Sequence, residues 1–313
     1  MVNAISLFTG CGGSDAGLID AGFNVIYAND RLTYARDTYL ANHPETNYQL
    51  ADIQTVKSFP KASILVGCYP CQGFSQGGVR DPSRKINQLY REFARALKQV
   101  KPKAFIVENV SGMIRKNFRH LLDDQFRVFE EVGYNVKADI LNASDFGVAQ
   151  NRKRIFIVGI RKDISAEYFF PSPTHGEDSS LSSKKTIKEA LKGLPKWPNG
   201  EFYDLEFHWY YLSRNRYCGW GEQSKTIVAN PRHMPLHPIS PKLKKHAHND
   251  WRFEKNGAAR RFSYREAARL QGFDDLSFPE TPAKNLNSCY TVAGNAVPPP
   301  LFSAVASALP DIW

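Results

Sequence analysis

The first half of the chain alternates short apolar runs with longer amphipathic stretches, and this alternation restricts the fold more than any other sequence feature. Six apolar runs are predicted to be strands: residues 4–8, 24–28, 62–66, 104–107, 135–141 and 154–160. Four stretches between them have the apolar spacing of helices: residues 15–21, 32–42, 86–100 and 118–131. Because strands that alternate with helices form a mostly parallel sheet, we predict a doubly wound α/β domain.

This regular alternation ends after Arg161, where prolines, aromatic residues and polar segments become frequent. Residues 171–278 contain 18 Lys and Arg against 12 Asp and Glu, so they carry much of the net charge of +10. We predict a second, smaller domain over 171–278 and a first domain over 1–170 plus 279–313. A proline-led helix at 301–309 is expected to pack back on the first domain.

The bulk composition restricts the class of protein. A net charge of +10 favours a polyanionic partner such as nucleic acid, although a soluble enzyme can also be basic. The sequence lacks an apolar run of about 18 residues and a basic-then-apolar leader, so we expect a cytoplasmic protein. Five scattered cysteines predict free thiols. The spacing of His and Cys does not match a zinc site, so we expect no metal.

A glycine-rich turn, Phe8-Thr9-Gly10-Cys11-Gly12-Gly13, follows the first predicted strand and opens a helix, which lets backbone amides approach a polar ligand. A dinucleotide fingerprint needs a further glycine where this chain has Asp15, so a nucleoside without phosphates is favoured. Asp30 is a candidate acceptor for ribose hydroxyls, and Asp52 for an adenine amino group. Each acid could equally be a turn or helix-cap residue.

The segment Gly67-Cys68-Tyr69-Pro70-Cys71 follows the third predicted strand and contains the reactive-thiol candidate. Cys68-x-x-Cys71 also matches a redox dithiol, which local sequence does not exclude. A carboxyl at a strand end, Glu108, and two arginines before the last strand, Arg152 and Arg154, favour different chemistry. A dithiol oxidoreductase needs neither, whereas thiolate addition to a pyrimidine needs both.

That chemistry follows from the weak nucleophilicity of cytosine C5. Attack of a thiolate on C6 turns the ring into an enamine, and negative charge develops in the ring. A carboxyl at N3 and an arginine at O2 stabilise this charge. We assign Cys71 as nucleophile, Glu108 to N3, and Arg152 or Arg154 to O2. The reaction cannot occur within a duplex, so the base must be flipped out.

In this order, and over nearly the whole chain, these residues resemble the DNA cytosine-5 methyltransferase family. Further matching segments are 142–154, 261–273 and 294–298. The resemblance implies a Rossmann-like S-adenosylmethionine-dependent fold, with S-adenosylmethionine as methyl donor, S-adenosylhomocysteine as product, and no metal. It implies a cofactor site formed by Phe8, Gly10, Gly12, Gly13, Asp30, Asp52, Ile53, Pro70, Leu89, Asn295 and Ala296.

The family also implies that the smaller domain reads the sequence of double-stranded DNA. The candidate DNA-binding residues are Gln72, Ser75, Arg80, Arg214, Arg216, Thr226 and Arg232. Each arginine taken singly fits a phosphate contact better than a base contact. We expect one aromatic group to form the core of this domain rather than a stacking platform: Phe202, Tyr203, Phe207, Trp209, Tyr210 and Tyr211.

Several alternatives and departures stay open. The resemblance implies a monomeric bacterial or phage enzyme paired with a restriction endonuclease. An RNA cytosine-5 methyltransferase, a dithiol oxidoreductase and a catalytically silent DNA-binding relative are the alternatives. The family usually has Gly-Pro where this chain has Cys68-Tyr69, and residues 81–84 lack its Arg-Gly continuation. Residues 76–80, with two adjacent glycines, are predicted to be a mobile loop that closes over the base.

Overall fold

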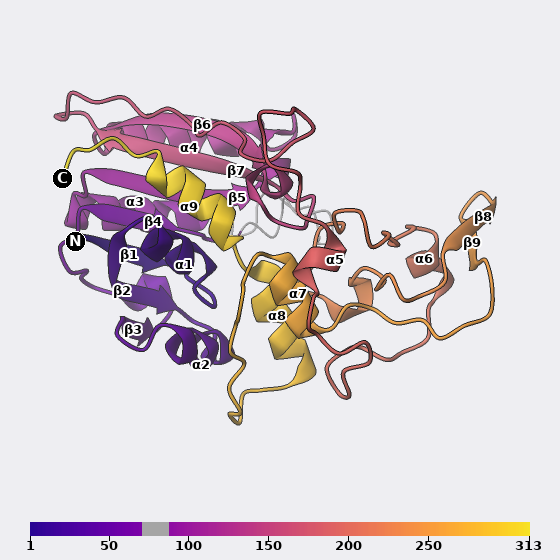
Figure 1. Ribbon diagram of the computed structural model, residues 1–313. Helices are drawn as coiled ribbons and strands as arrows, with labels where there is room; N and C mark the ends of the chain where they lie inside the picture. Colours follow the sequence, from indigo (N-terminus) through magenta and orange to yellow (C-terminus); the bar gives the residue numbers. More distant parts are fainter. Residues whose placement is uncertain (71–87) are drawn as a thin grey trace. The chain divides into compact units, whose positions relative to one another are not determined.

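A central sheet organises the first of two units of the chain (Figure 1). The computed structural model describes residues 1–70 and 88–313, and within them seven strands form this sheet in the order β3-β2-β1-β4-β5-β7-β6. The strands are β1 (Val2–Leu7), β2 (Phe23–Asp30), β3 (Asn47–Leu50), β4 (Ile64–Gly67), β5 (Ala104–Val110), β6 (Tyr134–Asn142) and β7 (Lys153–Arg161). Strand β7 pairs antiparallel with both β5 and β6, and the other pairings in this sheet are parallel.

The doubly wound α/β fold predicted from the sequence is confirmed. All six predicted strands are present, and each strand end lies within three residues of its predicted position. The short edge strand β3 was not among them. Its residues are mostly exposed, and it is held by backbone pairing with β2 rather than by burial, so it has no apolar signature.

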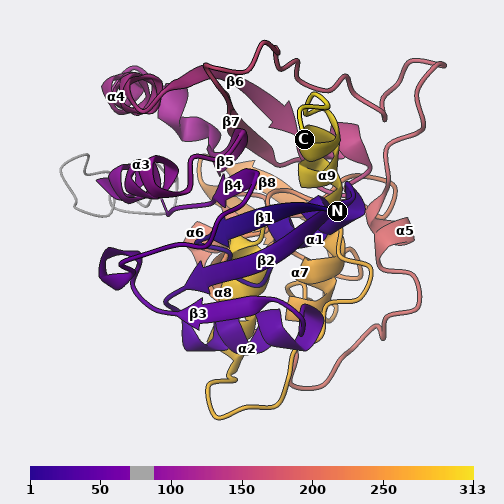
Figure 2. The same cartoon turned by 90° about the vertical axis from the view of Figure 1, so that its left-hand side faces the viewer.

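Helices cover both faces of the sheet (Figure 2). Helices α3 (Leu89–Val100) and α4 (Arg119–Glu131) lie on one face, and α1 (Gly13–Asp20) and α9 (Pro299–Ser307) on the other; α2 (Thr33–Asn42) flanks β3. As predicted, the C-terminal helix packs back on this unit. A Cβ at Gly17 in α1 would lie only 2.7 Å from the backbone oxygen of Pro299, so glycine permits this close approach.

The strand order indicates at which edge of the sheet a ligand is expected to bind. Strand order reverses between β1 and β4, because the chain leaves β1 toward β2 and leaves β4 toward β5. At such a switch point the two connections diverge, and a crevice opens at the carboxyl ends of the strands. The glycine-rich turn follows β1 and the residues that precede Cys71 follow β4, so both candidate segments begin at this edge.

The second unit has less regular structure. Unit 1 comprises Met1–Asn142, Lys153–Ser172 and Pro299–Trp313, and unit 2 comprises Ala143–Arg152 and Pro173–Pro298. The helices and strands of unit 2 are α5 (Ile187–Ala190), α6 (Trp209–Leu212), β8 (Leu243–Ala247), β9 (Asp250–Phe253), α7 (Tyr264–Leu270) and α8 (Leu286–Asn295). This division differs from the predicted domains at 143–152, 171–172 and 279–298. The functional division into catalytic and recognition domains stays a prediction.

A buried ion pair organises unit 2. The Arg260 guanidinium donates to both carboxylate oxygens of Glu266 at 2.7 Å, and both side chains are almost completely excluded from solvent. Glu266 also accepts from the backbone N–H of Ser263 and so completes the capping box of α7. The Nε2 of His237 lies 3.4 Å from Glu266. Burial, with the Arg260 charge as second cause, lowers the pKa of His237 to about 3.

Two further observations concern the lengths of the helices and the state of the cysteines. None of the helices in the described residues is long and apolar enough to cross a membrane. Cys11, Cys68, Cys218 and Cys289, the cysteines within the described residues, form no disulfide with one another.

We expect unit 2 to lose stability in mild acid because of His237. An unfolded histidine takes up a proton below about pH 6.5, whereas folded His237 stays neutral down to about pH 3. The stabilisation that neutral His237 contributes is therefore complete above pH 6.5 and is lost as the pH falls from 6.5 to 3. At pH 5 the free energy of unfolding should be lower by about 2 kcal/mol. Urea unfolding at pH 7.5 and pH 5 measures this loss, and tryptophan fluorescence reports mainly on unit 2, which contains four of the five tryptophans.

The matched variants are His237→Asn and His248→Asn. An asparagine at 237 can still accept from the Ile239 N–H, as His237 Nδ1 does at 3.1 Å, but it cannot be protonated. His237→Asn should remove most of the pH-dependent loss. His248 is exposed, and its variant should retain that loss. Equal pH dependence in the two variants would refute this assignment.

Candidate active site

The glycine-rich turn after β1 depends on left-handed backbone conformations. Phe8, Gly10 and Gly12 have φ angles of 59°, 57° and 89°. A Cβ at Gly12 would lie 2.6 Å from the ring of His43, so both its conformation and its packing require glycine. By contrast, the position of a Cβ at Gly10 has no protein atom within 4 Å among the described residues. The turn is therefore tightly packed at Gly12, whereas Gly10 faces open space.

A buried carboxylate fixes this turn from within. Asp15 accepts from the hydroxyls of Thr9 at 2.6 Å and Ser14 at 2.9 Å, and it is completely buried. In the sequence, Asp15 is recognisable only as the residue that breaks the dinucleotide fingerprint. An acid close to two hydroxyl residues is a common pattern, so the sequence alone does not show that these three side chains form a buried network.

Asp30, at the end of β2, is joined directly to the turn. Its carboxylate accepts from the backbone N–H of Gly10 at 3.0 Å, and from those of Arg31 and Leu32 at 2.7 and 3.0 Å. Burial raises the pKa of Asp30, and these N–H groups oppose that effect. The structure thus brings together two predicted cofactor residues, Gly10 and Asp30, at the carboxyl edge of the sheet.

The remaining predicted cofactor residues have varied settings. Asp52 is the N-cap of a short 3-10 helix (Ile53–Thr55), where it accepts from the Gln54 N–H at 3.0 Å. This is the helix-cap alternative considered for Asp52. Because the carboxylate is exposed, it can cap the helix and also accept a hydrogen bond from an amino group. Ile53 is buried, and Leu89 packs against the core at the start of α3. Asn295 and Ala296 belong to unit 2, at the end of α8.

Glu108 and Arg154 form an ion pair at the same sheet edge, with 2.9 Å between Arg154 Nε and Glu108 Oε1. Strands β5 and β7 are antiparallel, and Val110 lies opposite Arg154, so Glu108 is the diagonal neighbour of Arg154 on one face. Both side chains are largely buried. Burial lowers the pKa of Arg154, while the Glu108 charge opposes this. The pair is thus a desolvated acid beside a desolvated guanidinium.

The backbone that leads to Cys71 is held from two sides. The Tyr69 carbonyl accepts from the Asn109 side chain at 3.1 Å, and the Tyr69 hydroxyl donates to Gln125 in α4 at 2.6 Å. Tyr69 and Gln125 are both buried, and the Phe8 ring meets the Tyr69 ring edge-on. The unusual tyrosine is therefore an anchor of the segment after β4. Gln125 has no recognisable signal in the sequence, because its partner Tyr69 is 56 residues away.

Arg152 and Arg154 have different roles in the structure. Arg152, in unit 2, is buried and donates to the backbone carbonyls of Ile227, Gly294 and Ala296 at 3.0 to 3.3 Å. It thereby ties the Ile227 segment to the end of α8. Nearby, the buried Gln150 side chain accepts from the Ile227 N–H. Arg154, in unit 1, is the arginine that forms the ion pair with Glu108.

The predicted DNA-reading residues of unit 2 are mostly accessible. Arg214 and Arg232 are exposed, and each hydrogen-bonds a tyrosine hydroxyl, of Tyr210 and Tyr203 respectively. Arg216 is half-buried; burial lowers its pKa, and its Nε has no hydrogen-bond partner within the described residues. Thr226 donates to the Asn151 carbonyl at 2.9 Å.

The aromatic group predicted as the core of this domain is only partly buried. Tyr211 is buried, and Phe207 packs against it. Trp209 and Tyr210 are 60% and 44% exposed, so the core prediction is wrong for these two residues. The physical reason is the short helix α6, which turns successive side chains to different sides.

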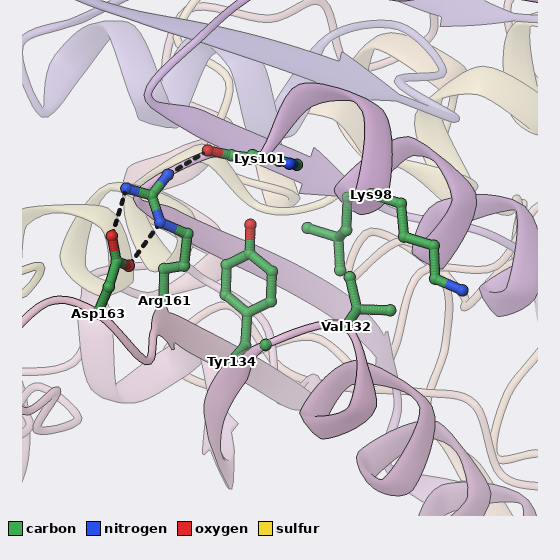
Figure 3. A pocket seen from close by; sticks show the side chains of 8 residues that line it. Lys98, Lys101, Val132, Tyr134, Arg161 and Asp163 are labelled. Atoms are coloured by element: carbon green, nitrogen blue, oxygen red, sulfur yellow. Dashed lines mark hydrogen bonds and ion pairs between the residues drawn. The ribbon is translucent and has the colours of Figure 1, made fainter.

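A cavity of about 490 Å³ lies at the opposite edge of the sheet (Figure 3). Tyr134 at the start of β6, Arg161 at the end of β7 and the last turn of α3 line it. Arg161 is engaged by Asp163 and by the Lys101 carbonyl. Since no predicted site residue is among those that line this cavity, it is separate from the candidate site.

Four predicted site residues, Cys71, Gln72, Ser75 and Arg80, lie outside the described residues. The predicted loop 76–80 and the departure at 81–84 lie outside them as well.

Comparisons with known proteins agree over the whole chain. A family model described as C-5 cytosine-specific DNA methylase matches residues 2–311. Type II methyltransferase M.BsuRI of Bacillus subtilis is 39% identical over 98% of this chain and 78% of its own. M.NgoPII of Neisseria gonorrhoeae is 38% identical over 97% and 94%. The structure of S. pombe Dnmt2 methyltransferase has a TM-score of 0.71 at 19% identity, covering 98% of both chains, and shows the fold.

Cys68 should behave as an unreactive thiol. Burial, with the charge of Glu108 as second cause, raises its pKa well above the usual value, so little thiolate is present at pH 8. We expect iodoacetamide to alkylate Cys68 much more slowly in the native protein than in urea, as measured by peptide mass spectrometry. The Cys68→Ala variant identifies the peptide. Alkylation as fast in the native protein as in urea would restore the dithiol interpretation.

Proposed function

The chain belongs to the family of C-5 cytosine-specific DNA methylases, and from this premise we propose how its residues act on DNA. Its activity is that of a DNA (cytosine-5)-methyltransferase. We propose that Cys71 bonds covalently to C6 of a cytosine flipped out of duplex DNA, and that C5 receives a methyl group from S-adenosylmethionine. The observation that carries the proposal is the buried Glu108–Arg154 pair beside the segment that leads to Cys71.

The pair supplies what the addition step requires. Attack of the Cys71 thiolate on C6 places negative charge on N3 and O2 of the ring. Glu108 hydrogen-bonds or protonates N3, and Arg154 binds O2, where the charge develops. When Arg154 turns to O2 it leaves Glu108, which favours the protonated carboxyl that N3 needs. Loss of the C5 proton and release of the Cys71 thiol restore aromaticity.

We give Arg152 a structural role within unit 2. Its guanidinium is engaged by three backbone carbonyls, so we assign O2 binding to Arg154 alone. Asn109 and Gln125 hold Tyr69, two residues before the nucleophile, and so restrict the backbone from which Cys71 extends.

The residues of the glycine-rich turn fit a nucleoside cofactor without phosphates. Gly10 faces open space, and the carboxylates of Asp30 and Asp52 would accept from hydroxyl and amino groups but repel a phosphate. Phe8, Gly12, Gly13, Ile53, Pro70 and Leu89 complete the part of the proposed site that lies in unit 1. Asn295 and Ala296, in unit 2, stay cofactor residues predicted from the sequence. When bound there, S-adenosylmethionine supplies an electrophilic methyl group.

We assign double-stranded DNA as the partner of unit 2. Arg214, Arg216 and Arg232 offer guanidinium groups suited to phosphates and guanine edges, and Thr226 lies close to them in sequence. Several relatives bear the name type II methyltransferase, which supports a role in restriction and modification. We further propose that the enzyme is monomeric and cytoplasmic, and that it is paired with a restriction endonuclease.

Trapping with 5-fluorocytosine tests the covalent mechanism. The protein is incubated with labelled S-adenosylmethionine and duplex DNA that contains 5-fluorocytosine, which blocks loss of the C5 substituent, and the products are separated on a denaturing gel. We expect a labelled protein–DNA band for wild type and none for Cys71→Ser. Identical behaviour of the two proteins would refute the mechanism. A band with 5-fluorocytosine RNA alone would support the RNA-modifying alternative.

Replacement of Glu108 by glutamine should slow the chemistry without loss of cofactor. Glutamine can still accept from Arg154 but cannot protonate N3, so we expect kcat to fall by about 100-fold or more. Calorimetry should find the affinity for S-adenosylmethionine unchanged. Glu130→Gln, at an exposed position of α4, is the matched control and should keep full activity. A Glu108→Gln enzyme with wild-type kcat would exclude the proposed proton donor.

A further inference from the structure

Helix α6 of unit 2 exposes the aromatic side chains that a core would be expected to bury. Trp209 and Tyr210 are 60% and 44% exposed, whereas Tyr211, the next residue, is 3% exposed. Leu205, just before the helix, is 56% exposed. Such a cluster of large apolar side chains in solvent marks a surface that another molecule covers.

Charged groups around α6 indicate the chemistry of that molecule. The Arg214 guanidinium lies 4.8 Å from the centre of the Tyr210 ring and donates to its hydroxyl at 2.8 Å. The Trp209 ring meets Tyr210 edge-on at 5.8 Å. These three side chains, Trp209, Tyr210 and Arg214, are called the α6 platform below.

The hairpin of β8 and β9 lies beside α6. It packs against α6, and the rings of Phe207 and Phe253 meet at 5.5 Å between the two segments. Lys244 and Lys245 on β8 are exposed, whereas Arg252 on β9 is paired with Asp250. Around the exposed rings, the exposed basic residues Arg214, Lys242, Lys244 and Lys245 outnumber the exposed acids of the same segments, which are Asp204, Glu206 and Glu254.

This combination suits nucleic acid better than protein. Unstacked bases present flat faces, and deoxyribose presents C–H groups, to aromatic rings, while phosphates complement lysine and arginine. Protein interfaces with an aromatic centre are depleted of lysine. A second copy of this chain would also bring the same positive charges together.

We propose that the α6 platform stacks against a base or deoxyribose of the DNA substrate. The proposal rests on the proposed function, since it takes duplex DNA as the partner of unit 2, and it adds an apolar contact to the ionic ones. Stacking does not release counterions, so this contact contributes to affinity with little dependence on salt.

The test compares DNA affinity across salt concentrations. The probe is a labelled duplex cut from plasmid DNA that the wild-type enzyme methylates, and anisotropy is measured from 50 to 300 mM NaCl. We expect Trp209→Ser and Tyr210→Ser each to weaken binding by about 5- to 100-fold, with an unchanged slope of log affinity against log salt. Tyr210→Phe keeps the ring and should bind as wild type.

Lys244→Ser is the matched ionic control. It should weaken binding mainly at low salt and reduce the salt slope by about 1. Because Trp209 and Tyr210 are exposed, their variants should unfold at nearly the wild-type temperature. This separates a binding effect from a folding effect.

Three outcomes would overturn the proposal. The first is wild-type DNA affinity in both serine variants at all salt concentrations. The second is a reduced salt slope in those variants, which would assign them to phosphate contacts. The third is a wild-type dimer in sedimentation that the serine variants dissociate, which would identify a second copy as the occupant. Failure of wild type to methylate cytosine C5 would instead refute the proposed function.

Discussion

The ion pair between Glu108 and Arg154 is the interaction on which the candidate site depends. Withdrawal of a guanidinium from water costs several kcal/mol, and the lowered pKa of Arg154 reflects this cost. The charge of Glu108 offsets it, so neither residue is stable there alone. The antiparallel direction of β7 makes the pairing possible. If β7 ran parallel to β5, its first residues, Arg154 among them, would lie at the opposite edge of the sheet.

The sequence predicted those parts of the fold that burial of apolar side chains determines. The six predicted strands have apolar runs because they lie within the sheet. Strand β3 pairs through its backbone at the sheet edge, and its Asn47, Tyr48 and Gln49 have no apolar pattern. In unit 2, charged residues such as Arg260 and Glu266 are buried together. In a sequence they resemble surface residues, because only the folded chain brings one to the other.

The sequence predicted which kinds of side chain the site contains, but not which residue has which role. The pattern Arg152-x-Arg154 identifies two candidate guanidinium groups, but only long-range contacts distinguish them. The carbonyls that hold Arg152 lie 75 to 144 residues away in the sequence. Asp15 likewise stands where a dinucleotide fingerprint has glycine, and only its contacts with two hydroxyls in the structure show what it does. Local patterns therefore indicate which chemistry is present, whereas topology decides which residue performs it.

The arginines of unit 2 show why net charge alone is a poor measure of DNA binding. Arg260 is paired with Glu266, and Arg261 lies among the rings of Tyr203, Phe207 and Tyr211, where it donates to backbone carbonyls. Burial lowers the pKa of Arg261. Its guanidinium stabilises unit 2 through these ring and carbonyl contacts and is not available to a phosphate. An electrostatic attraction for DNA must then come from exposed groups such as Arg214, Arg232 and Lys244. It is the solvent exposure of each basic residue, and not the total of +10, that sets how strongly the surface attracts phosphates.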